Sequence, residues 1–259
     1  MSRGPLPRLD AVPTSPDTSA DSTPVNTAWS GSPDGPLLAI DASATASAAV
    51  VHRGEVFARF ASTETNTHAE VLTPAVQQVL TEAKVEARDL AGLVAGVGPG
   101  PFTGLRAGLV TAQTLGFAWN LPVYGVMSLD AIALPAAEEA FRAGVEEFVV
   151  ATDARRKEVY WAHYASVGGQ FQRLHGPFVT APAEVTPLPA YGAGAGLYAD
   201  VLHAVEGFSH AVPDAGQLGL VGELALRRGR GLMPVVPLYL RDSDAQVPGP
   251  RKRAGTGER

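Results

Sequence analysis

The sequence has no cysteine among its 259 residues. This absence excludes a disulfide scaffold, a cysteine-based zinc site and a thiol nucleophile, and it fits a reducing compartment. No Gly-X-Y period runs through the 28 glycines and 21 prolines, so the chain is not collagen-like. Hydrophobic residues make up 46% and charged residues 18%, which is enough apolar material for a core and excludes a disordered acidic protein.

Long hydrophobic runs are missing as well. Gly, Pro or a charged residue interrupts every apolar stretch before the ~18 residues that a membrane-spanning helix needs. The first residues lack the apolar core of a signal peptide, so we expect no membrane association and a cytoplasmic location. The net charge of −6 argues against a chain whose main task is to bind nucleic acid through its phosphates.

The two ends of the chain differ in composition from its centre. Residues 1–36 hold seven prolines among Ser, Thr, Asp and Gly, which predicts a disordered leader. Residues 242–259 form a second polar segment, predicted to be a disordered basic tail. Its basic cluster at 251–253 is either simply solvated or a contact for RNA. The folded region is expected at 37–240.

Apolar runs and helical periodicity alternate through the folded region. Helix 67–86 is expected to begin at a capping box of Thr67 and Glu70, and Ser128 is expected to cap a later helix. Hairpins and strand–helix units mix in two halves, each of which opens with a strand that ends in Asp, and this favours an α/β fold with mixed sheets. The predicted strands are 37–41, 47–53, 55–60, 92–98, 122–126, 147–153, 158–165 and 170–174, and the predicted helices are 67–86, 103–119, 128–142, 196–206 and 214–229.

We expect two subdomains, with the chain passing from one to the other near residues 144–147. The N-terminal subdomain is predicted at 37–143 and the C-terminal subdomain at 144–213. The last helix, 214–229, is predicted to pack back on the N-terminal subdomain.

A glycine-rich turn at 96–106 joins a predicted strand to a predicted helix. Such a turn can bind an anion at the helix N-terminus, here through Gly100, Thr103 and Gly104. It matches neither a Walker A loop nor a dinucleotide-binding fingerprint, and two prolines remove N–H donors from it. The alternative is a rigid turn in which Thr103 is the N-cap.

Two further segments carry groups that could bind a ligand. Asp41, Ser43 and Thr45 follow the first strand, where an Asp and hydroxyl groups could meet a nucleotide phosphate and its Mg²⁺; the alternative is a turn that satisfies its own backbone. A charged turn contains Asp153, Arg155 and Glu158. It could position an acidic partner or a nucleotide, or it could be a solvated hairpin turn with local ion pairs, and its role stays open.

The sequence predicts no metal site and no catalytic residue in this chain. No two of the six histidines are four residues apart, so no helix presents a histidine pair to a metal. Ser128 lacks the flanking glycines of a nucleophile elbow.

Several segments, in this order, resemble the bacterial TsaB (YeaZ) family over about residues 37–242. They are LLAIDASATASAAVV from residue 37, His68-Ala69-Glu70, GVGPGPFTGLRAGLVTAQTLGFAWNLPVYGVMSLDAIA from residue 96, ATDARRKEVYWAHY from residue 151, and PLYLRD from residue 237.

The resemblance implies an actin-like (ASKHA, ribonuclease H-like) α/β fold of two subdomains with mixed sheets and helices packed on them. It also implies a role in making N6-threonylcarbamoyladenosine (t6A) in tRNA, next to the anticodon. In that family the chain is a non-catalytic scaffold, the partner of a TsaD-like catalytic subunit that works with a TsaE-like ATPase. The chain is expected to hold no cofactor, to contact tRNA only indirectly and to form homodimers when alone.

The metal and the ATP with Mg²⁺ are then expected in the partner subunits. Consistent with this, His68 is followed four residues later by Leu72, where the catalytic relative carries a second histidine. We hypothesise that helices 67–86 and 103–119 form the subunit contact, with small residues letting helices of two chains approach closely. The interface candidates are His68, Val71, Ala75, Gln78, Arg106, Ala107 and Thr111.

A second class of function stays open at this point. The chain could be an independent enzyme of the same fold, either a small-molecule kinase or an M22-type metallopeptidase. The missing histidine pair argues against the peptidase, and the lack of a complete phosphate site argues against the kinase.

Overall fold

A computed structural model describes residues 35–63 and 68–241 of the chain. The predictions for residues 1–34, for the cap at Thr67 and for the tail 242–259 lie outside these residues. The last two residues of the predicted leader are part of the fold, because the Pro36 carbonyl accepts a hydrogen bond from the Ala91 amide at 2.9 Å.

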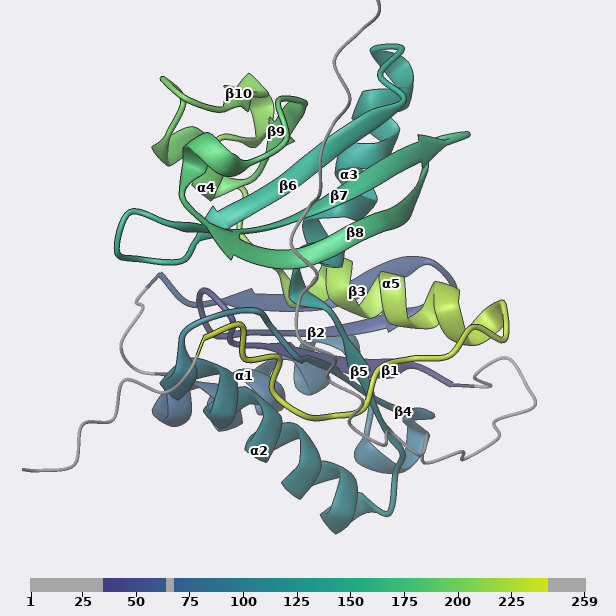
Figure 1. Ribbon diagram of the computed structural model, residues 1–259. Coiled ribbons are helices and arrows are strands. Elements are labelled where there is room, and N and C mark those ends of the chain that lie inside the picture. Colours follow the sequence, from purple (N-terminus) through teal and green to yellow (C-terminus); the bar gives the residue numbers. More distant parts are fainter. Residues whose placement is uncertain (1–34, 64–67, 242–259) are drawn as a thin grey trace, which may run out of the picture.

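Within these described residues the chain forms two five-stranded sheets with five α-helices (Figure 1). The strands are β1 (Leu37–Asp41), β2 (Ser47–His52), β3 (Glu55–Ala61), β4 (Gly92–Gly96), β5 (Val123–Val126), β6 (Glu147–Asp153), β7 (Val159–Val167), β8 (Gln170–Thr180), β9 (Pro189–Tyr191) and β10 (His203–Ala204). The helices are α1 (His68–Ala83), α2 (Phe102–Trp119), α3 (Ser128–Arg142), α4 (Ala193–Leu197) and α5 (Ala215–Arg227).

The first sheet has the order β3-β2-β1-β4-β5, with β1, β4 and β5 parallel and the β1-β2-β3 meander antiparallel. Both faces of the sheet are covered, which explains why β1 is an unbroken apolar run. Leu38 and Ile40 pack with α1 and α2 on one face, whereas Leu37 and Ala39 pack with α5 on the other. Helix α5 thus covers the face of this sheet that lies opposite α1 and α2.

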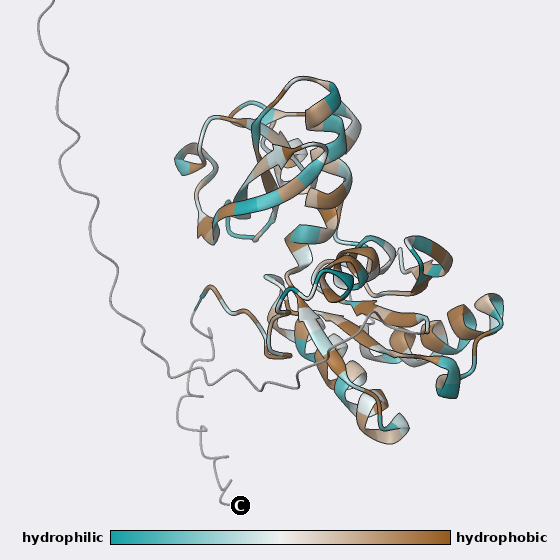
Figure 2. Ribbon diagram, turned by 90° about the vertical axis from the view of Figure 1, so that its right-hand side faces the viewer, coloured by the Kyte–Doolittle hydropathy of each residue, from teal (hydrophilic) through white to brown (hydrophobic). Residues whose placement is uncertain are grey.

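The second sheet has the order β10-β9-β6-β7-β8, and it forms the second lobe seen in Figure 2. Phe148 of β6 and Tyr164 of β7 lie on one face with the buried residues of α3. The opposite face carries Val149, Ala151 and Trp161, with α4 beside them. The strand ladder β6-β7-β8 is antiparallel, and its β7–β8 pair is the hairpin predicted across residues 168–169.

The packing of helix α3 moves the subdomain boundary, which the sequence predicted at residue 143. Its buried residues, among them Leu129, Ile132 and Ala136, belong to the core of the second sheet. The helix nevertheless also touches α5, through Ala131 in the core that α5 forms with the first sheet. By packing, the second lobe thus begins at α3 and not at β6.

Three local predictions about helices are wrong. Helix α2 begins at Phe102 with Pro101 in the cap position, so Thr103 is no cap. Ser128 is the first residue of α3, not a cap. The helix expected at 196–206 is absent: α4 ends at Leu197, and His203–Ala204 instead form β10, which pairs with β9.

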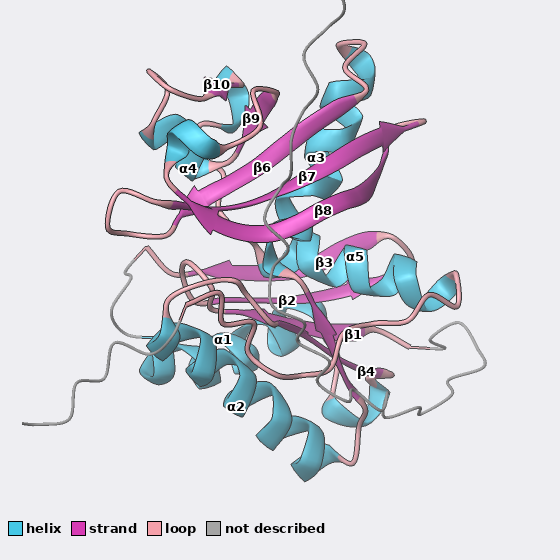
Figure 3. Cartoon of the chain, in the orientation of Figure 1, coloured by secondary structure: helices cyan, strands magenta, loops and turns pink. Residues whose placement is uncertain are grey.

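Residues 230–241, which we name the C-terminal strap, follow α5 as an extended loop (Figure 3). Met233 exchanges two backbone hydrogen bonds with Gly125 of β5, at 2.9 and 3.0 Å. The Leu238 amide donates to the Val97 carbonyl at 2.8 Å, and Arg241 donates to the Ala154 carbonyl at 3.0 Å. The strap therefore connects the first sheet to the β6–β7 turn of the second lobe.

Candidate functional site

The buried carboxyl group of Asp41 stands at the end of β1 and is the centre of a hydrogen-bond network. Its Oδ1 accepts from the Ser43 amide at 2.9 Å and from the Ser43 hydroxyl at 2.7 Å. Its Oδ2 accepts from the Ser128 hydroxyl at 2.6 Å, and Ser128 Oγ in turn accepts from the Gly98 amide at 3.1 Å. The network joins β1, the glycine-rich turn and the start of α3.

Burial raises the pKa of Asp41 above its usual value, against the lowering effect of the hydrogen bonds from Ser128 and Ser43. The carboxyl group is completely shielded from solvent. Removing a carboxylate from water is unfavourable unless partners replace the lost hydration, and here hydroxyl and amide donors do so. The role of Ser128 is to hold this group, which explains why it does not cap α3.

The two segments predicted to bind phosphate pack directly on each other. A side chain at Gly100 would lie 2.4 Å from the Ser43 carbonyl, and one at Gly96 would overlap Asp41 Oδ2. Gly104 is buried, whereas Thr103 is exposed and Thr45 is half-buried. The structure thus brings Asp41, Ser43 and the glycine-rich turn together. Both carboxylate oxygens of Asp41 accept hydrogen bonds from hydroxyl and amide groups of the chain itself.

The charged turn between β6 and β7 makes one ion pair within the turn and a second one with the strap. Asp153 Oδ1 accepts from the Arg155 amide at 2.8 Å, and Oδ2 lies 3.2 Å from the Arg155 guanidinium. Glu158 forms an ion pair with Arg241 of the strap. Residues 155–157 all have positive φ angles, between 54° and 63°, a conformation that non-glycine residues rarely adopt. The partnership of Glu158 with the strap has no signal in the local sequence.

The interface candidates on α1 and α2 differ in how far their side chains are exposed. Ala75 is buried in the core of its own chain, which contradicts its expected place in a subunit contact. Val71, Ala107 and Thr111 are half-buried, and Val71 and Ala107 pack against the same core. Gln78 is exposed. For His68 the structure gives the backbone position at the start of α1 only.

Arg106 is exposed at the start of α2 and takes part in a stack. Its guanidinium lies 3.6 Å from the centre of the Phe102 ring, and its Nε donates to the Tyr239 hydroxyl at 2.9 Å. The rings of Phe102 and Tyr239 stack with centroids 4.8 Å apart. The stack fixes the strap to α2.

The small residues of α2 have a role different from the expected one. Gly108, Ala112 and Gly116 are buried, and a side chain at Gly116 would lie 2.3 Å from Val123 of β5. They allow α2 to approach its own sheet. The exposed face of α2 instead carries Val110, 60% exposed, and Phe117, 91% exposed. These two residues are seven apart, opposite the small-residue face, and this is the sequence signal that could have identified them.

Within residues 35–63 and 68–241, no three His, Asp or Glu side chains come close enough to hold a metal ion. No helix in the same part of the chain is long and apolar enough to span a lipid bilayer.

Comparisons with known proteins agree with this architecture. The family model described as TsaD, tRNA N6-adenosine threonylcarbamoyltransferase, matches residues 55–211. YeaZ from Pseudomonas aeruginosa superposes with a TM-score of 0.68 at 31% identity, covering 80% of this chain and 100% of that one. The uncharacterized protein Rv3421c of Mycobacterium tuberculosis is 41% identical over 214 residues, 81% of this chain and 93% of that protein.

The name of another relative states a function. The tRNA threonylcarbamoyladenosine biosynthesis protein TsaB of Escherichia coli is 38% identical over 130 residues, which are 49% of this chain and 54% of that protein. The chain has the actin-like α/β fold and belongs to the TsaB (YeaZ) family.

Proposed function

We propose that the chain takes part in the biosynthesis of threonylcarbamoyladenosine in tRNA, as a non-catalytic partner and scaffold for a TsaD-like catalytic subunit. Membership of the TsaB (YeaZ) family supports the pathway. The engaged state of Asp41, with both carboxylate oxygens accepting bonds from Ser43 and Ser128, supports a structural role for the loop that could otherwise have bound a nucleotide. ATP, Mg²⁺ and the catalytic metal then belong to the TsaD-like subunit and to a TsaE-like ATPase.

The observation that carries the scaffold role is the exposed apolar face of α2. Phe117 leaves nine-tenths of its surface in water, and Val110 lies two turns away on the same face. Helix α1 lies beside α2 on the same side of the sheet (Figure 1), where it exposes Gln77, Gln78 and Thr81. An apolar centre with a polar border is the usual composition of a protein interface. We infer that this surface binds the TsaD-like subunit, or a second copy of the chain when that subunit is absent, and that tRNA is contacted through the partner.

The test is to measure binding between this chain and the TsaD-like subunit from the same organism. Phe117→Ser should weaken the complex about tenfold or more, because a large aromatic side chain at an interface centre is a typical hot spot. Phe141→Ser is the matched control, since Phe141 is 58% exposed on α3, away from the proposed contact, and should leave affinity unchanged.

The same variants should be added to a complete tRNA modification reaction with the TsaE-like ATPase. Modified adenosine should fall with Phe117→Ser and not with Phe141→Ser, and the chain alone should form none. Equal affinity of the Phe117→Ser variant and the wild type would disprove the interface. Modification that proceeds fully without the chain would disprove the scaffold role.

A further inference from the structure

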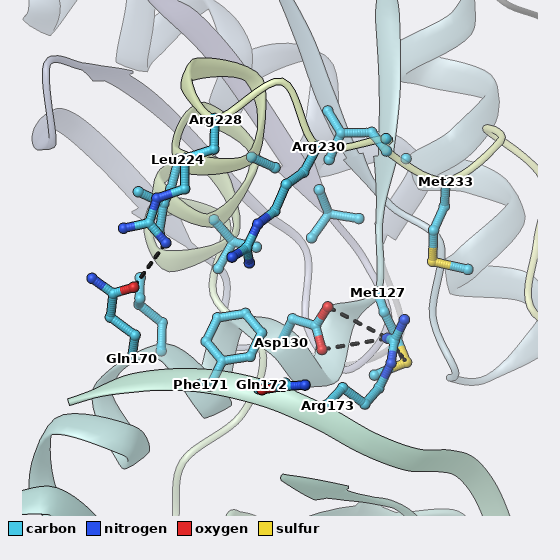
Figure 4. A pocket seen from close by; sticks show the side chains of 17 residues that line it. Met127, Asp130, Gln170, Phe171, Gln172, Arg173, Leu224, Arg228, Arg230 and Met233 are labelled. Carbon is cyan, nitrogen blue, oxygen red and sulfur yellow. Dashed lines mark hydrogen bonds and ion pairs between the residues drawn. The ribbon is translucent and has the colours of Figure 1, made fainter. Parts of the chain in front are cut away.

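A pocket of about 250 Å³ lies between the two lobes, separate from the Asp41 network (Figure 4). Five segments form its walls: the end of β5, the first turns of α3, the start of β8, the C-terminal end of α5 and the start of the strap. None of the residues that hold Asp41 lines it. Pockets at the junction of two lobes are common places for small ligands, because several elements can contribute side chains there.

The inner wall of the pocket is apolar. Phe171 of β8, Leu134 of α3 and Leu224 of α5 line this wall, and Figure 4 labels Phe171 and Leu224 in it. Val221, Leu232 and Met233 complete this wall. Such a surface favours a ligand with an aromatic or aliphatic body, since apolar area removed from water contributes about 25 cal/mol per Å².

Three arginines, Arg173, Arg228 and Arg230, stand around the apolar wall. Arg228 donates to Gln170 Oε1 at 2.8 Å. Arg173 donates to the Met127 sulfur at 2.9 Å and lies 3.5 Å from both carboxylate oxygens of Asp130. A thioether is a weak acceptor, and each guanidinium has five N–H donors, so most of the donors of these two arginines remain available.

Arg230 is the most available of the three. Its side chain makes no hydrogen bond or ion pair with any residue in the described ranges, and Figure 4 shows it directed from the strap toward Phe171 and Asp130. Its backbone is fixed, because its amide donates to the Ala225 carbonyl at 2.9 Å. An anchored backbone with a free guanidinium is suited to binding an anion.

Asp130 is the one carboxylate among the pocket-lining residues. It is largely shielded from solvent and accepts a hydrogen bond from the Tyr164 hydroxyl at 2.9 Å. Three cations therefore face one carboxylate in a chain whose net charge is −6. This concentration of positive charge runs against the overall charge of the protein, which points to an anionic ligand.

We propose that this pocket binds a small organic anion that has an aromatic or apolar body. Its phosphate or carboxylate group is held by Arg228 and Arg230, and its body covers Phe171 and Leu224. Guanidinium groups bind both kinds of anion in paired, planar hydrogen bonds, which is why arginine suits this site better than lysine. The proposal does not depend on the proposed role in tRNA modification.

The test is to titrate the full chain with 1-naphthyl phosphate and to follow the naphthyl fluorescence. We expect saturable binding of one ligand per chain. Arg230→Ala and Arg228→Ala should each weaken it about tenfold, the effect of losing one charge-assisted contact of roughly 1.4 kcal/mol. Arg142→Ala is the matched control, because Arg142 is an exposed arginine at the far end of α3, and it should not change the affinity.

Further arms separate the ligand classes. Tighter binding of 1-naphthoate would assign a carboxylate ligand, and tighter binding of 1-naphthyl phosphate a phosphate ester; either supports the proposal. Absence of binding, binding that the arginine variants do not weaken, or inorganic phosphate binding as tightly as the naphthyl compound would overturn it. Phe117→Ser should bind the probe normally, so a failure of the scaffold role remains distinguishable from a failure here.

Discussion

At the residue scale, two buried carboxyl groups define how this protein handles charge. Asp41 is fully buried and Asp130 is largely shielded from water, and desolvation is the main cause of the raised pKa of each. Asp41 receives donors on both oxygens from its own chain. Asp130 has one hydroxyl partner, Tyr164, and an ion pair with Arg173, whose guanidinium lies 3.5 Å from its carboxylate oxygens. The Asp41 carboxyl group thus bonds to its own chain on both oxygens, whereas the Asp130 carboxyl group lines the pocket between the lobes.

The titration of Asp130 predicts a pH dependence of stability. Burial raises the pKa of Asp130 to about 6 from an ordinary value of 3.8, although Arg173 and the Tyr164 hydrogen bond lower it. The folded chain therefore binds this proton more tightly than the unfolded chain does. The free energy of unfolding should fall as pH rises from about 4 to above 6, by on the order of 3 kcal/mol from this group.

Asp130→Asn should remove that part of the pH dependence, because an amide does not titrate but can still accept from Tyr164. Urea unfolding at a series of pH values measures the effect, with Asp89→Asn at an exposed site as the control. An unchanged pH profile in the Asp130 variant would show that this group does not titrate as the structure indicates.

At the element scale, α5 holds the first sheet together. Gly219 and Gly222 let the helix approach the sheet, since a side chain at either would lie within 3 Å of Val51 or Val94. Glu223 of the same helix is buried and accepts from the amides of Arg53 and Gly54 in the β2–β3 turn. The helix thus contributes packing to the sheet and an acceptor to the turn.

Glu223→Ala should lower the free energy of unfolding by about 3 kcal/mol, because two turn amides lose a charged acceptor and Arg227 loses its partner. Glu82→Ala, at an exposed position of α1, should change it by less than about 0.5 kcal/mol. Denaturant unfolding gives both values. A loss as small as that of the Glu82 variant would mean that water replaces Glu223 as the acceptor.

Much of the element order could be predicted from the sequence, because local patterns carry it. The apolar period of α1, the Asp214 cap of α5 and the glycines at 168–169 all act within a few residues, and the structure has those elements. Predictions failed where a distant partner decides the outcome. Ser128 bonds to Asp41, 87 positions away, instead of capping α3. Ala75, by contrast, lies three residues after Leu72 and four before Val79, so the helical period itself places it in the core.

At the scale of the whole molecule, the strap links the two lobes. It is bonded to β5 through Met233 and to the β6–β7 turn through Arg241, with the stack on Phe102 between them. No local pattern predicts this path, nor the arginine pocket, whose cationic residues come from β8, the residue that follows α5, and the strap. These features arise only when the chain is folded, and a single sequence contains no periodic signal for them.

Arg241→Ala should loosen the contact between the lobes without unfolding either. The strap and the 153–158 turn should both exchange amide hydrogens faster, since each loses the partner that holds it. Strand β1 should keep its protection. Hydrogen exchange read by mass spectrometry measures all three segments, and Arg59→Ala on the exposed side of β3 is the control. Faster exchange in β1 as well would indicate general destabilisation and contradict a local role.

The return of α5 to the first sheet also has a consequence for how the chain is made. One face of β1, β2 and β4 packs on a helix that lies at residues 215–227, after the whole second sheet in chain order. During translation at about 5–20 residues per second, that face stays uncovered for many seconds after its strands have left the ribosome. The nascent protein therefore exposes an apolar sheet face until late in synthesis, and chaperones recognise exposed apolar surface of this kind.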